Sequence, residues 1–303
     1  MLQHPLARLG WRAELQSDLD ALGDPSLVAA RAIAVDRGSA IVDTGVRSWR
    51  APLSGRLRRA AAMPATGDFV AVVADGPVRA VLPRRGVIAR RVERRGTQVL
   101  AANVDLALLA TSLNRDLKPR RLARFLAITA RGDVDAVVLL TKCDLVADPA
   151  SVAGEVAAEL DDTPVLTVSA LDGTGVGAVR ELLEPARTAV LLGTSGVGKS
   201  TLVNALLGEE RYATTAIRTG DDRGRHTTVR RELVPLPGGA LLVDTPGLRL
   251  VAPLEDADEP VPLLDKAEIK RERRARARAV HRQRYRQLRD ERRHREARDR
   301  RHG

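Results

Sequence analysis

The fold of this chain is constrained most strongly by one segment of eight residues, Gly193-Thr194-Ser195-Gly196-Val197-Gly198-Lys199-Ser200. It fits the P-loop pattern, in which glycines let backbone N–H groups curl around phosphate and the following helix presents its N-terminus to the same anion. An apolar run, Ala189–Leu192, precedes the segment, and a helix is expected to begin near Lys199. The sequence therefore predicts a strand, a phosphate-binding loop and a helix, in that order.

From Asn103 onward the chain has the pattern of a parallel α/β domain. Short continuous apolar runs alternate with helical stretches, which is typical of strands buried on both faces. Ligands of such folds bind at the carboxyl ends of the strands, and most of these runs end directly in a polar motif. A nucleotide site is therefore expected at that edge. The predicted strands are Leu106–Ala110, Ala136–Leu140, Val165–Val168, Ala189–Leu192 and Leu241–Val243.

Two of the polar motifs are expected to bind the base of a guanine nucleotide. Thr141-Lys142-Cys143-Asp144 follows the second predicted strand. The Asp144 carboxylate can accept hydrogen bonds from the N1–H and 2-amino group of guanine, which adenine cannot donate. The aliphatic part of Lys142 would lie on the face of the base, and Thr141 stands where GTPases usually have Asn. Ser169-Ala170 ends the third strand, where a backbone N–H can contact the guanine O6.

Residues in and after the P-loop are expected to bind the phosphates and a magnesium ion. Lys199 should contact the β- and γ-phosphates, Ser200 should bind Mg²⁺, and Thr201 belongs to the same nucleotide-binding set. Asp244-Thr245-Pro246-Gly247 follows the last predicted strand. This places Asp244 near Mg²⁺ and the Gly247 N–H near the γ-phosphate.

The polar loop Thr214–Arg231 is expected to act as a switch. One threonine in it must bind Mg²⁺ and sense the γ-phosphate; Thr227 and Thr228 are the candidates, and we favour Thr227. Leu248 stands where many GTPases carry a water-orienting Gln, and an apolar side chain cannot orient water. His226 is the candidate for that role, with a surface loop histidine as the alternative. The predicted catalytic residues are His226, Lys199 and Thr227, and the predicted magnesium ligands are Ser200, Thr227 and Asp244.

The chain before this domain has the pattern of a small all-β unit. The runs Phe69–Ala74 and Pro77–Leu82 predict a hairpin around Asp75-Gly76, and other short runs are separated by Gly and Pro turns. A five-stranded barrel of the OB type is expected. Because the unit has few aromatic residues that could stack on bases, we expect its arginines to contact RNA phosphates. The alternative is that these arginines only form a solvated rim of the barrel. They are Arg56, Arg58, Arg59, Arg84, Arg85, Arg90, Arg91, Arg94 and Arg95.

Positive charge is concentrated at the C-terminal end. Lys266–Gly303 contains 17 Lys and Arg against 6 Asp and Glu, a net +11 that equals the charge of the whole chain, so the preceding residues balance to zero. The segment favours helix but has no wide apolar stripe, which predicts a basic tail that orders on meeting a polyanion. An anionic membrane surface is the alternative partner for the tail. The tail lacks the apolar face that a membrane-bound helix needs, which argues against this alternative. The predicted divisions are an N-terminal segment 1–26, a barrel 27–97, a GTPase domain 98–252 and a basic helical tail 253–303.

The nucleotide motifs stand in circularly permuted order. GTPases normally begin with the P-loop, whereas here the base-binding motifs come first; joining the old chain ends leaves such a sheet unchanged. With a barrel in front, this order resembles the ribosome small-subunit-dependent GTPase A (RsgA) family. The matching stretches are Gln98–Asp105, Thr141–Leu145, Gly193–Leu206, Gly224–Thr228 and Asp244–Leu248.

The resemblance implies GTP hydrolysis stimulated by the small ribosomal subunit, a role in late maturation of that (30S) subunit, and contacts with rRNA. Family members usually end in a zinc-binding module. In this chain no cysteine follows Cys143, and His281, His294 and His302 lack ligand spacing. We therefore predict GTP and Mg²⁺ as the bound ligands and no zinc site.

The single cysteine and the lack of a long apolar run predict a cytoplasmic protein without membrane contact. We also expect the protein to be a monomer. Two alternatives stay open. One is an ATP-dependent P-loop protein, which a comparison of GTP and ATP binding separates. The other is a non-catalytic, nucleotide-gated RNA-binding module, which hydrolysis measured with and without small subunits would distinguish.

Overall fold

A computed structural model describes the chain over residues 4–59, 63–92, 96–113, 117–160, 163–212 and 231–244. All of these ranges fall within one unit, residues 1–256. A second unit, residues 257–303, contains most of the predicted basic tail (253–303) and lies outside the described residues.

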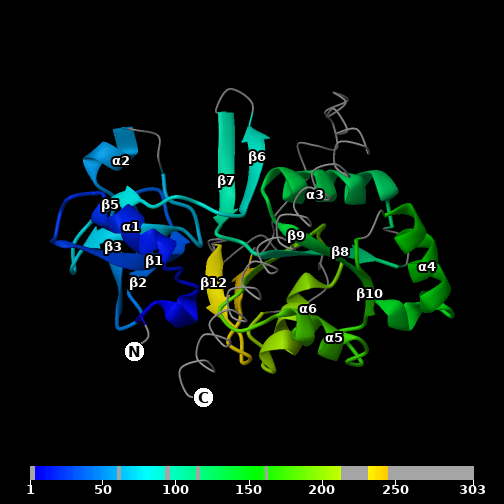
Figure 1. Cartoon of the computed structure of the whole chain (residues 1–303). Helices are drawn as coiled ribbons and strands as arrows, with labels where there is room; N and C mark the ends of the chain where they lie inside the picture. The colour runs from blue at the N-terminus through cyan, green and yellow to red at the C-terminus, as the bar shows by residue number, and fades with distance from the viewer. Residues whose placement is uncertain are drawn as a thin grey trace, which may run out of the picture. The chain divides into compact units, whose positions relative to one another are not determined.

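The N-terminal part is a small antiparallel β unit preceded by two short helices (Figure 1). Strand β1 pairs with β2 and β4, β2 pairs with β3, and β4 pairs with β5. A parallel bridge between Leu53 and Val78 connects the end of β3 to β5. The elements are η1 (Ala7–Leu9), α1 (Glu14–Asp20), β1 (Leu27–Val35), β2 (Ser39–Asp43), β3 (Ser48–Pro52), α2 (Gly55–Arg59), β4 (Phe69–Val73) and β5 (Val78–Val81).

The predicted hairpin between residues 69 and 82 is confirmed. Val70 pairs with Val81 and Ala71 with Ala80, and Asp75 takes a positive φ of 56° in the turn. Asp tolerates this left-handed conformation better than most residues, which is why it marks such turns. Small side chains fill the interior of this unit; the buried set includes Ala30, Ala32, Ala40, Val42, Ala51, Val70, Val72 and Val78.

The second part contains a mainly parallel sheet with helices on both faces. Its elements are β8 (Leu106–Ser112), α3 (Pro119–Arg131), β9 (Asp135–Thr141), η2 (Cys143–Leu145), α4 (Pro149–Glu159), β10 (Val165–Val168), α5 (Val176–Leu182), β11 (Thr188–Gly193), α6 (Lys199–Leu207), β12 (Glu232–Pro235) and β13 (Leu241–Asp244). The strands lie in the order β10-β9-β8-β11-β13-β12. All five predicted strands are confirmed, and they run parallel to one another; β12 alone in this series is antiparallel.

Apolar side chains cover both faces of this sheet. On one face Leu122 and Phe125 of α3 and Val156 of α4 pack on β8 and β9. On the other face Val179 of α5 and Leu202 of α6 pack on alternate residues of the same strands. Figure 1 shows α3 on one side of the sheet and α5 and α6 on the other. This two-faced burial explains why the strands read as continuous apolar runs rather than as alternating ones.

A separate hairpin, β6 (Val87–Val92) and β7 (Gly96–Ala102), precedes the parallel sheet. The Val87 N–H donates to the Gly132 carbonyl over 2.7 Å, and Ile88 packs in the same apolar cluster as α3. A Cβ on Gly132 would lie 1.8 Å from the Val87 carbonyl oxygen, so this close approach requires glycine. The boundary predicted between residues 97 and 98 falls inside β7.

The two parts are joined through strand β1. Ala34 of β1 pairs with Glu232 of β12, which continues the sheet. Beside this pairing, the buried Arg31 guanidinium donates to the carbonyls of Leu9 and Gly67 and, over 3.0 Å, to the Thr188 hydroxyl at the start of β11. Burial lowers the pKa of Arg31 to about 9. One side chain thus hydrogen-bonds to the N-terminal segment, the β unit and the parallel sheet.

Candidate nucleotide-binding site

The predicted nucleotide motifs meet at one edge of the parallel sheet. Strands β9, β10, β11 and β13 are parallel, so their carboxyl ends lie on the same side. Thr141 ends β9, Ser169 follows β10, Gly193 ends β11 and Asp244 ends β13. Despite the permuted order of the motifs, these four strand ends therefore lie on one edge of the sheet.

The P-loop connects β11 directly to α6, which begins at Lys199 as expected. Gly196 and Gly198 have φ values of 80° and 91°, a region that favours glycine. Gly193 is required for another reason, since a Cβ there would lie 2.5 Å from the Ala110 carbonyl oxygen. Val197 turns its side chain into the core under the loop, which fixes the loop to the sheet.

The lysine and hydroxyl groups of the P-loop are placed at its rim. Lys199 Nζ donates to the Gly193 carbonyl over 2.8 Å and to the Thr194 carbonyl, so its ammonium lies over the loop. Ser200 is exposed in the first turn of α6, and Thr201 beside it is half-buried. Backbone N–H groups at a helix N-terminus and an ammonium group at one place form an anion site.

Thr141 joins the base-binding motif to the phosphate-binding loop. Its buried hydroxyl lies 2.7 Å from the Val197 carbonyl and 3.2 Å from the Thr111 carbonyl. A hydroxyl carries one proton, and the shorter contact identifies Val197 as the acceptor. The sequence showed this threonine as a departure from the usual Asn, but it did not reveal that the hydroxyl makes this connection.

The rest of the base-binding motif forms a tight turn after β9. Lys142 has a positive φ of 58°, Cys143 is buried, and the Asp144 side chain is exposed at the edge. Burial, followed by the charges of Asp172 and Asp144, raises the pKa of the Cys143 thiol. The turn therefore buries a neutral thiol and leaves the carboxylate of Asp144 available to a ligand.

The Ser169-Ala170 segment is ordered by local hydrogen bonds. The buried Ser169 hydroxyl accepts from the Leu171 N–H over 3.3 Å, and the Ser169 N–H donates to the Thr174 carbonyl over 2.9 Å. Because the Ser169 N–H is engaged in this way, the Ala170 N–H is the candidate donor to guanine O6. Hydrogen bonds from Thr174 lower the pKa of Asp172 in the same turn.

Two exposed leucines flank the base-binding motifs; Leu145 belongs to the stretch noted in the sequence, whereas Leu171 was not singled out. Leu171 follows Ser169-Ala170 and is 83% exposed, and Leu145 follows Asp144 and is 62% exposed. In the sequence, both leucines can be found as the apolar residue that directly follows each polar motif. These side chains place apolar surface next to the expected position of the base.

Part of the predicted site lies outside the described residues. This holds for His226, Thr227 and Gly247, and the side chain of Asp244 is not described although its backbone pairs with Glu232. Across the ranges that the structure describes, no group of three or more His, Cys, Asp or Glu side chains could hold a metal ion. Within those same ranges no helix has the length and apolar character to cross a membrane.

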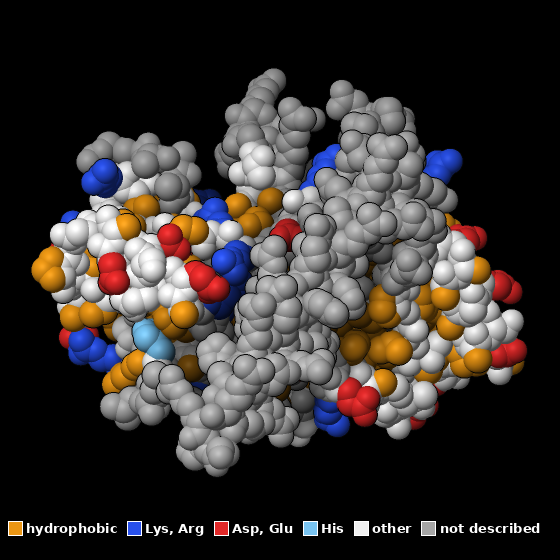
Figure 2. Space-filling view, in the orientation of Figure 1, with side chains coloured by type: hydrophobic (Ala, Val, Ile, Leu, Met, Phe, Trp, Pro, Cys, Tyr) orange, Lys and Arg blue, Asp and Glu red, His pale blue; other side chains and the backbone are white. Residues whose placement is uncertain are grey.

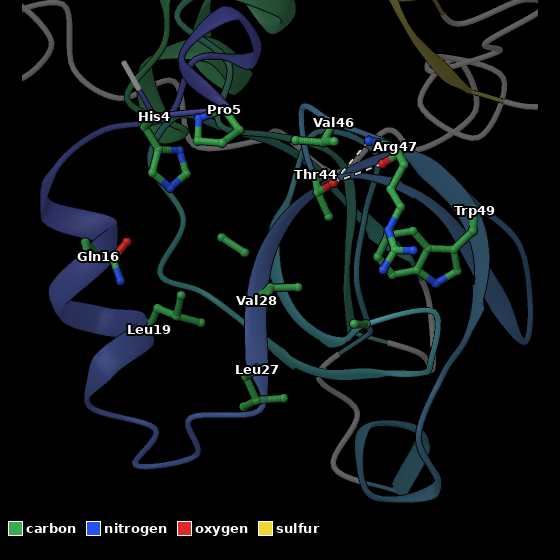
Figure 3. Close-up of a pocket in the computed structure, with 12 residues that line it drawn as sticks. His4, Pro5, Gln16, Leu19, Leu27, Val28, Thr44, Val46, Arg47 and Trp49 are labelled. Atoms are coloured by element: carbon green, nitrogen blue, oxygen red, sulfur yellow. Dashed lines mark hydrogen bonds between the residues drawn. The ribbon is translucent and has the colours of Figure 1, made fainter. Parts of the chain in front are cut away.

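A groove of about 430 Å³ lies elsewhere, on the N-terminal β unit (Figure 3). Leu19 of α1 and Val28 of β1 line it, together with Val46 and Trp49. Arg47 lies at its rim, where the guanidinium carbon is 5.5 Å from the Trp49 ring centroid and Nη1 is 2.6 Å from Asp75. None of the predicted nucleotide-binding residues lines this groove.

The fold and the site define a P-loop nucleotide-binding protein of the α/β class with its motifs in permuted order. Residues 81–252 match the family model described as RsgA GTPase, and the chain belongs to this family. The resemblance noted in the sequence is thereby confirmed. Family membership makes the chain a GTP hydrolase and decides against the ATP-dependent alternative.

Curated relatives agree with this family. The chain is 38% identical over 263 residues to "Small ribosomal subunit biogenesis GTPase RsgA" of Opitutus terrae, covering 80% of this chain and 72% of the relative. It is 42% identical over 268 residues to the protein of that name from Streptomyces avermitilis, covering 84% and 71%. For the relative from Methanosarcina acetivorans the identity is 44% over 208 residues, covering 66% and 56%.

Two solved structures share the fold. YjeQ from Thermotoga maritima aligns with a TM-score of 0.55 and 22% identity, over 73% of this chain and 75% of that one. YloQ, described as a circularly permuted GTPase, aligns with a TM-score of 0.51 and 21% identity, over 74% and 72%. These likenesses support the circularly permuted GTPase fold of the chain.

Proposed function

We propose that this GTPase acts in late maturation of the small ribosomal subunit, in contact with rRNA, and that the subunit stimulates its hydrolysis of GTP. The names of the curated relatives support the biological role. The observation that carries the nucleotide assignment is the hydrogen bond from Thr141 to Val197, because it brings the base-binding motif and the phosphate-binding loop into contact.

The proposed binding mode follows from the geometry of the edge. The P-loop backbone and Lys199 hold the phosphates, Asp144 accepts hydrogen bonds from guanine, and the Ala170 N–H donates to O6. The aliphatic part of Lys142 covers one face of the base. Cys143 and Thr141 support this turn from within the core, since both are buried.

Magnesium fits the donor groups at the phosphate end. The exposed Ser200 hydroxyl and the end of β13 at Asp244 lie on the same edge, and Mg²⁺ prefers oxygen ligands of this kind. Ser200, Asp244 and Thr227 would hold the ion, which would neutralise charge on the β- and γ-phosphates when bound. Lys199 adds a fixed positive charge to the same phosphates, and His226 is proposed to orient the attacking water.

The N-terminal part is proposed to be an OB-type barrel at residues 27–97 that contacts RNA, ahead of a GTPase domain at 98–252. The order of strand pairing and the bridge from Leu53 to Val78 support closure of five strands. The basic tail, 253–303, is proposed to bind rRNA electrostatically without zinc. We propose a cytoplasmic location, because small-subunit assembly is the role that the relatives' names give. We also propose that the protein is a monomer.

The test is GTP turnover with small subunits, with large subunits and with neither. Lys199→Ala is expected to abolish GTP binding or turnover while the circular dichroism spectrum stays that of the wild type. Asp144→Asn is expected to weaken GTP binding and to improve binding of xanthosine triphosphate, because an amide can donate to the 2-oxo group of xanthine. Equal turnover under all three conditions would refute the role of the small subunit, and unchanged nucleotide affinity in Lys199→Ala would refute the site.

A further inference from the structure

Helix α3 and its neighbouring residues carry an excess of positive charge. This excess does not show in the net charge of residues 1–265, which is zero. Residues 84–132 contain 12 Lys and Arg against three Asp and Glu, although residues 1–265 as a whole are neutral. Helix α3 itself has no acidic residue in its first turn. Its basic residues are Lys118 at the N-cap followed by Arg120, Arg121, Arg124 and Arg131.

The positions of these charges oppose the local rules for helix stability. Cations at a helix N-terminus are unfavourable because the macrodipole is positive there, and Arg120 and Arg124 repel each other at i and i+4. Lys118 and Arg120 are exposed, and in the part of the chain that the structure describes neither has an ion-pair partner. Charges placed against these rules mark a functional surface when a bound anion removes the repulsion between them.

The geometry of the helix arranges the charges for an extended polyanion. Arg120, Arg124 and Arg131 fall at i, i+4 and i+11, which places them on one stripe about 16 Å long. The opposite stripe, with Leu122 and Phe125, is buried against the sheet. In Figure 2, Lys and Arg side chains are visible near both ends of α3 as Figure 1 draws it.

We propose that this stripe of α3, with Lys118 beside it, binds the sugar–phosphate backbone of RNA. The inference rests on the proposed function, because it names a surface through which the GTPase domain meets its RNA partner. The stripe has no aromatic side chain that could stack on bases, so recognition is by phosphate charge and spacing. The β6–β7 hairpin, which carries Arg90, is anchored at Val87 to Gly132 at the end of α3.

The same helix contacts the nucleotide loop. Arg121 Nη1 lies 3.5 Å from the Thr194 hydroxyl, so the first turn of α3 touches the phosphate-binding segment. An RNA backbone bound on the outer stripe therefore acts on a helix whose inner side contacts the loop that holds the phosphates. This contact gives a direct route by which RNA docking changes the rate of GTP hydrolysis.

The test uses the full chain with Lys118→Glu and Arg120→Glu combined. Its charge-matched control is Arg180→Glu combined with Arg211→Glu, two exposed residues outside α3. Binding is measured on an RNA duplex of about 20 base pairs and on poly-glutamate at several salt concentrations. The α3 variant is expected to bind the duplex about tenfold more weakly, with a salt slope lower by about 2, while the control changes neither by as much.

A second readout separates a docking surface from a merely structural helix. Acidic residues at the helix N-terminus are favourable, so the α3 variant is expected to melt at a higher temperature than the wild type while binding RNA more weakly. Equal loss of RNA affinity in variant and control, or a loss confined to poly-glutamate, would overturn the proposal. So would a matching loss of GTP affinity, which would assign these charges to the nucleotide. Stimulation by small subunits is measured separately, so its absence would refute the proposed function without deciding the α3 surface.

Discussion

The Thr141 hydroxyl donates a hydrogen bond of 2.7 Å to the Val197 carbonyl, and this contact links the base-binding turn to the phosphate-binding loop. The two motifs lie 56 residues apart in the sequence. Strand β8 lies between the strands that carry them, so the bond crosses an intervening strand end. The turn proposed to bind the base and the loop proposed to bind the phosphates are therefore in direct contact.

Replacing Thr141 with Val is expected to weaken nucleotide binding. The substitution keeps the shape of the side chain but leaves the Val197 carbonyl without its donor, at a cost of about 1.4 kcal/mol, or roughly tenfold in affinity. Titration with fluorescent GDP and GTP analogues measures the effect. Thr141→Ser retains the hydroxyl and serves as the control; equal affinities in the Val and Ser variants would contradict the role assigned to the hydroxyl.

Replacing Gly198 with Ala is expected to destabilise the P-loop. The φ of 91° disfavours a Cβ by about 1–2 kcal/mol even though space is open around the residue. We expect lower nucleotide affinity and a lower melting temperature. Gly154→Ala in α4 is the matched control: its Cβ also meets nothing within 4 Å, and it should stabilise the helix by up to about 1 kcal/mol. The idea fails if both variants shift the melting temperature in the same direction.

Cys143 is expected to resist alkylation in the folded protein. Burial raises the pKa of its thiol, so less of the reactive thiolate is present near neutral pH than in the unfolded chain. A group whose folded pKa lies above its unfolded value stabilises the fold below the unfolded pKa, and this contribution is lost as the pH rises through the folded pKa. Stability should thus decline in the alkaline range.

Iodoacetamide labelling with and without denaturant measures the protection, and Cys143→Ser gives the matched pH–stability profile. A native labelling rate equal to the unfolded rate would show that the thiol is not protected. An identical alkaline decline in Cys143→Ser would assign that decline to other groups.

Replacing Arg31 with Met is expected to destabilise both parts of the described unit together. The guanidinium hydrogen-bonds to the Leu9 and Gly67 carbonyls and to the Thr188 hydroxyl, and their loss costs about 3 kcal/mol. Arg47→Met is the control, because its ion pair with Asp75 is exposed and contributes at most about 1 kcal/mol. Thermal unfolding followed by circular dichroism should show the larger drop for Arg31; similar drops in the two variants would argue against a buried connection.

Much of the nucleotide domain could be predicted because its signals are local. Strands buried on both faces appear as continuous apolar runs, and the strands from Leu106 to Val243 were placed within two residues of their observed ends. The P-loop glycines and the hairpin at Asp75-Gly76 follow from backbone conformations that few residues accept. The roles of His226 and Thr227 stay predictions, since they lie outside the described residues.

The sequence by itself determined which segments form the five parallel strands, where the phosphate loop begins and in what order the motifs stand. The tertiary structure decided that Thr141 joins the two ends of the nucleotide site, that Arg31 connects the β unit to β11, and that β6 and β7 form a hairpin on α3. The physical reason is range. Apolar periodicity and turn chemistry act over a few neighbouring residues, whereas these contacts depend on strand order and register, which bring together residues far apart in the chain.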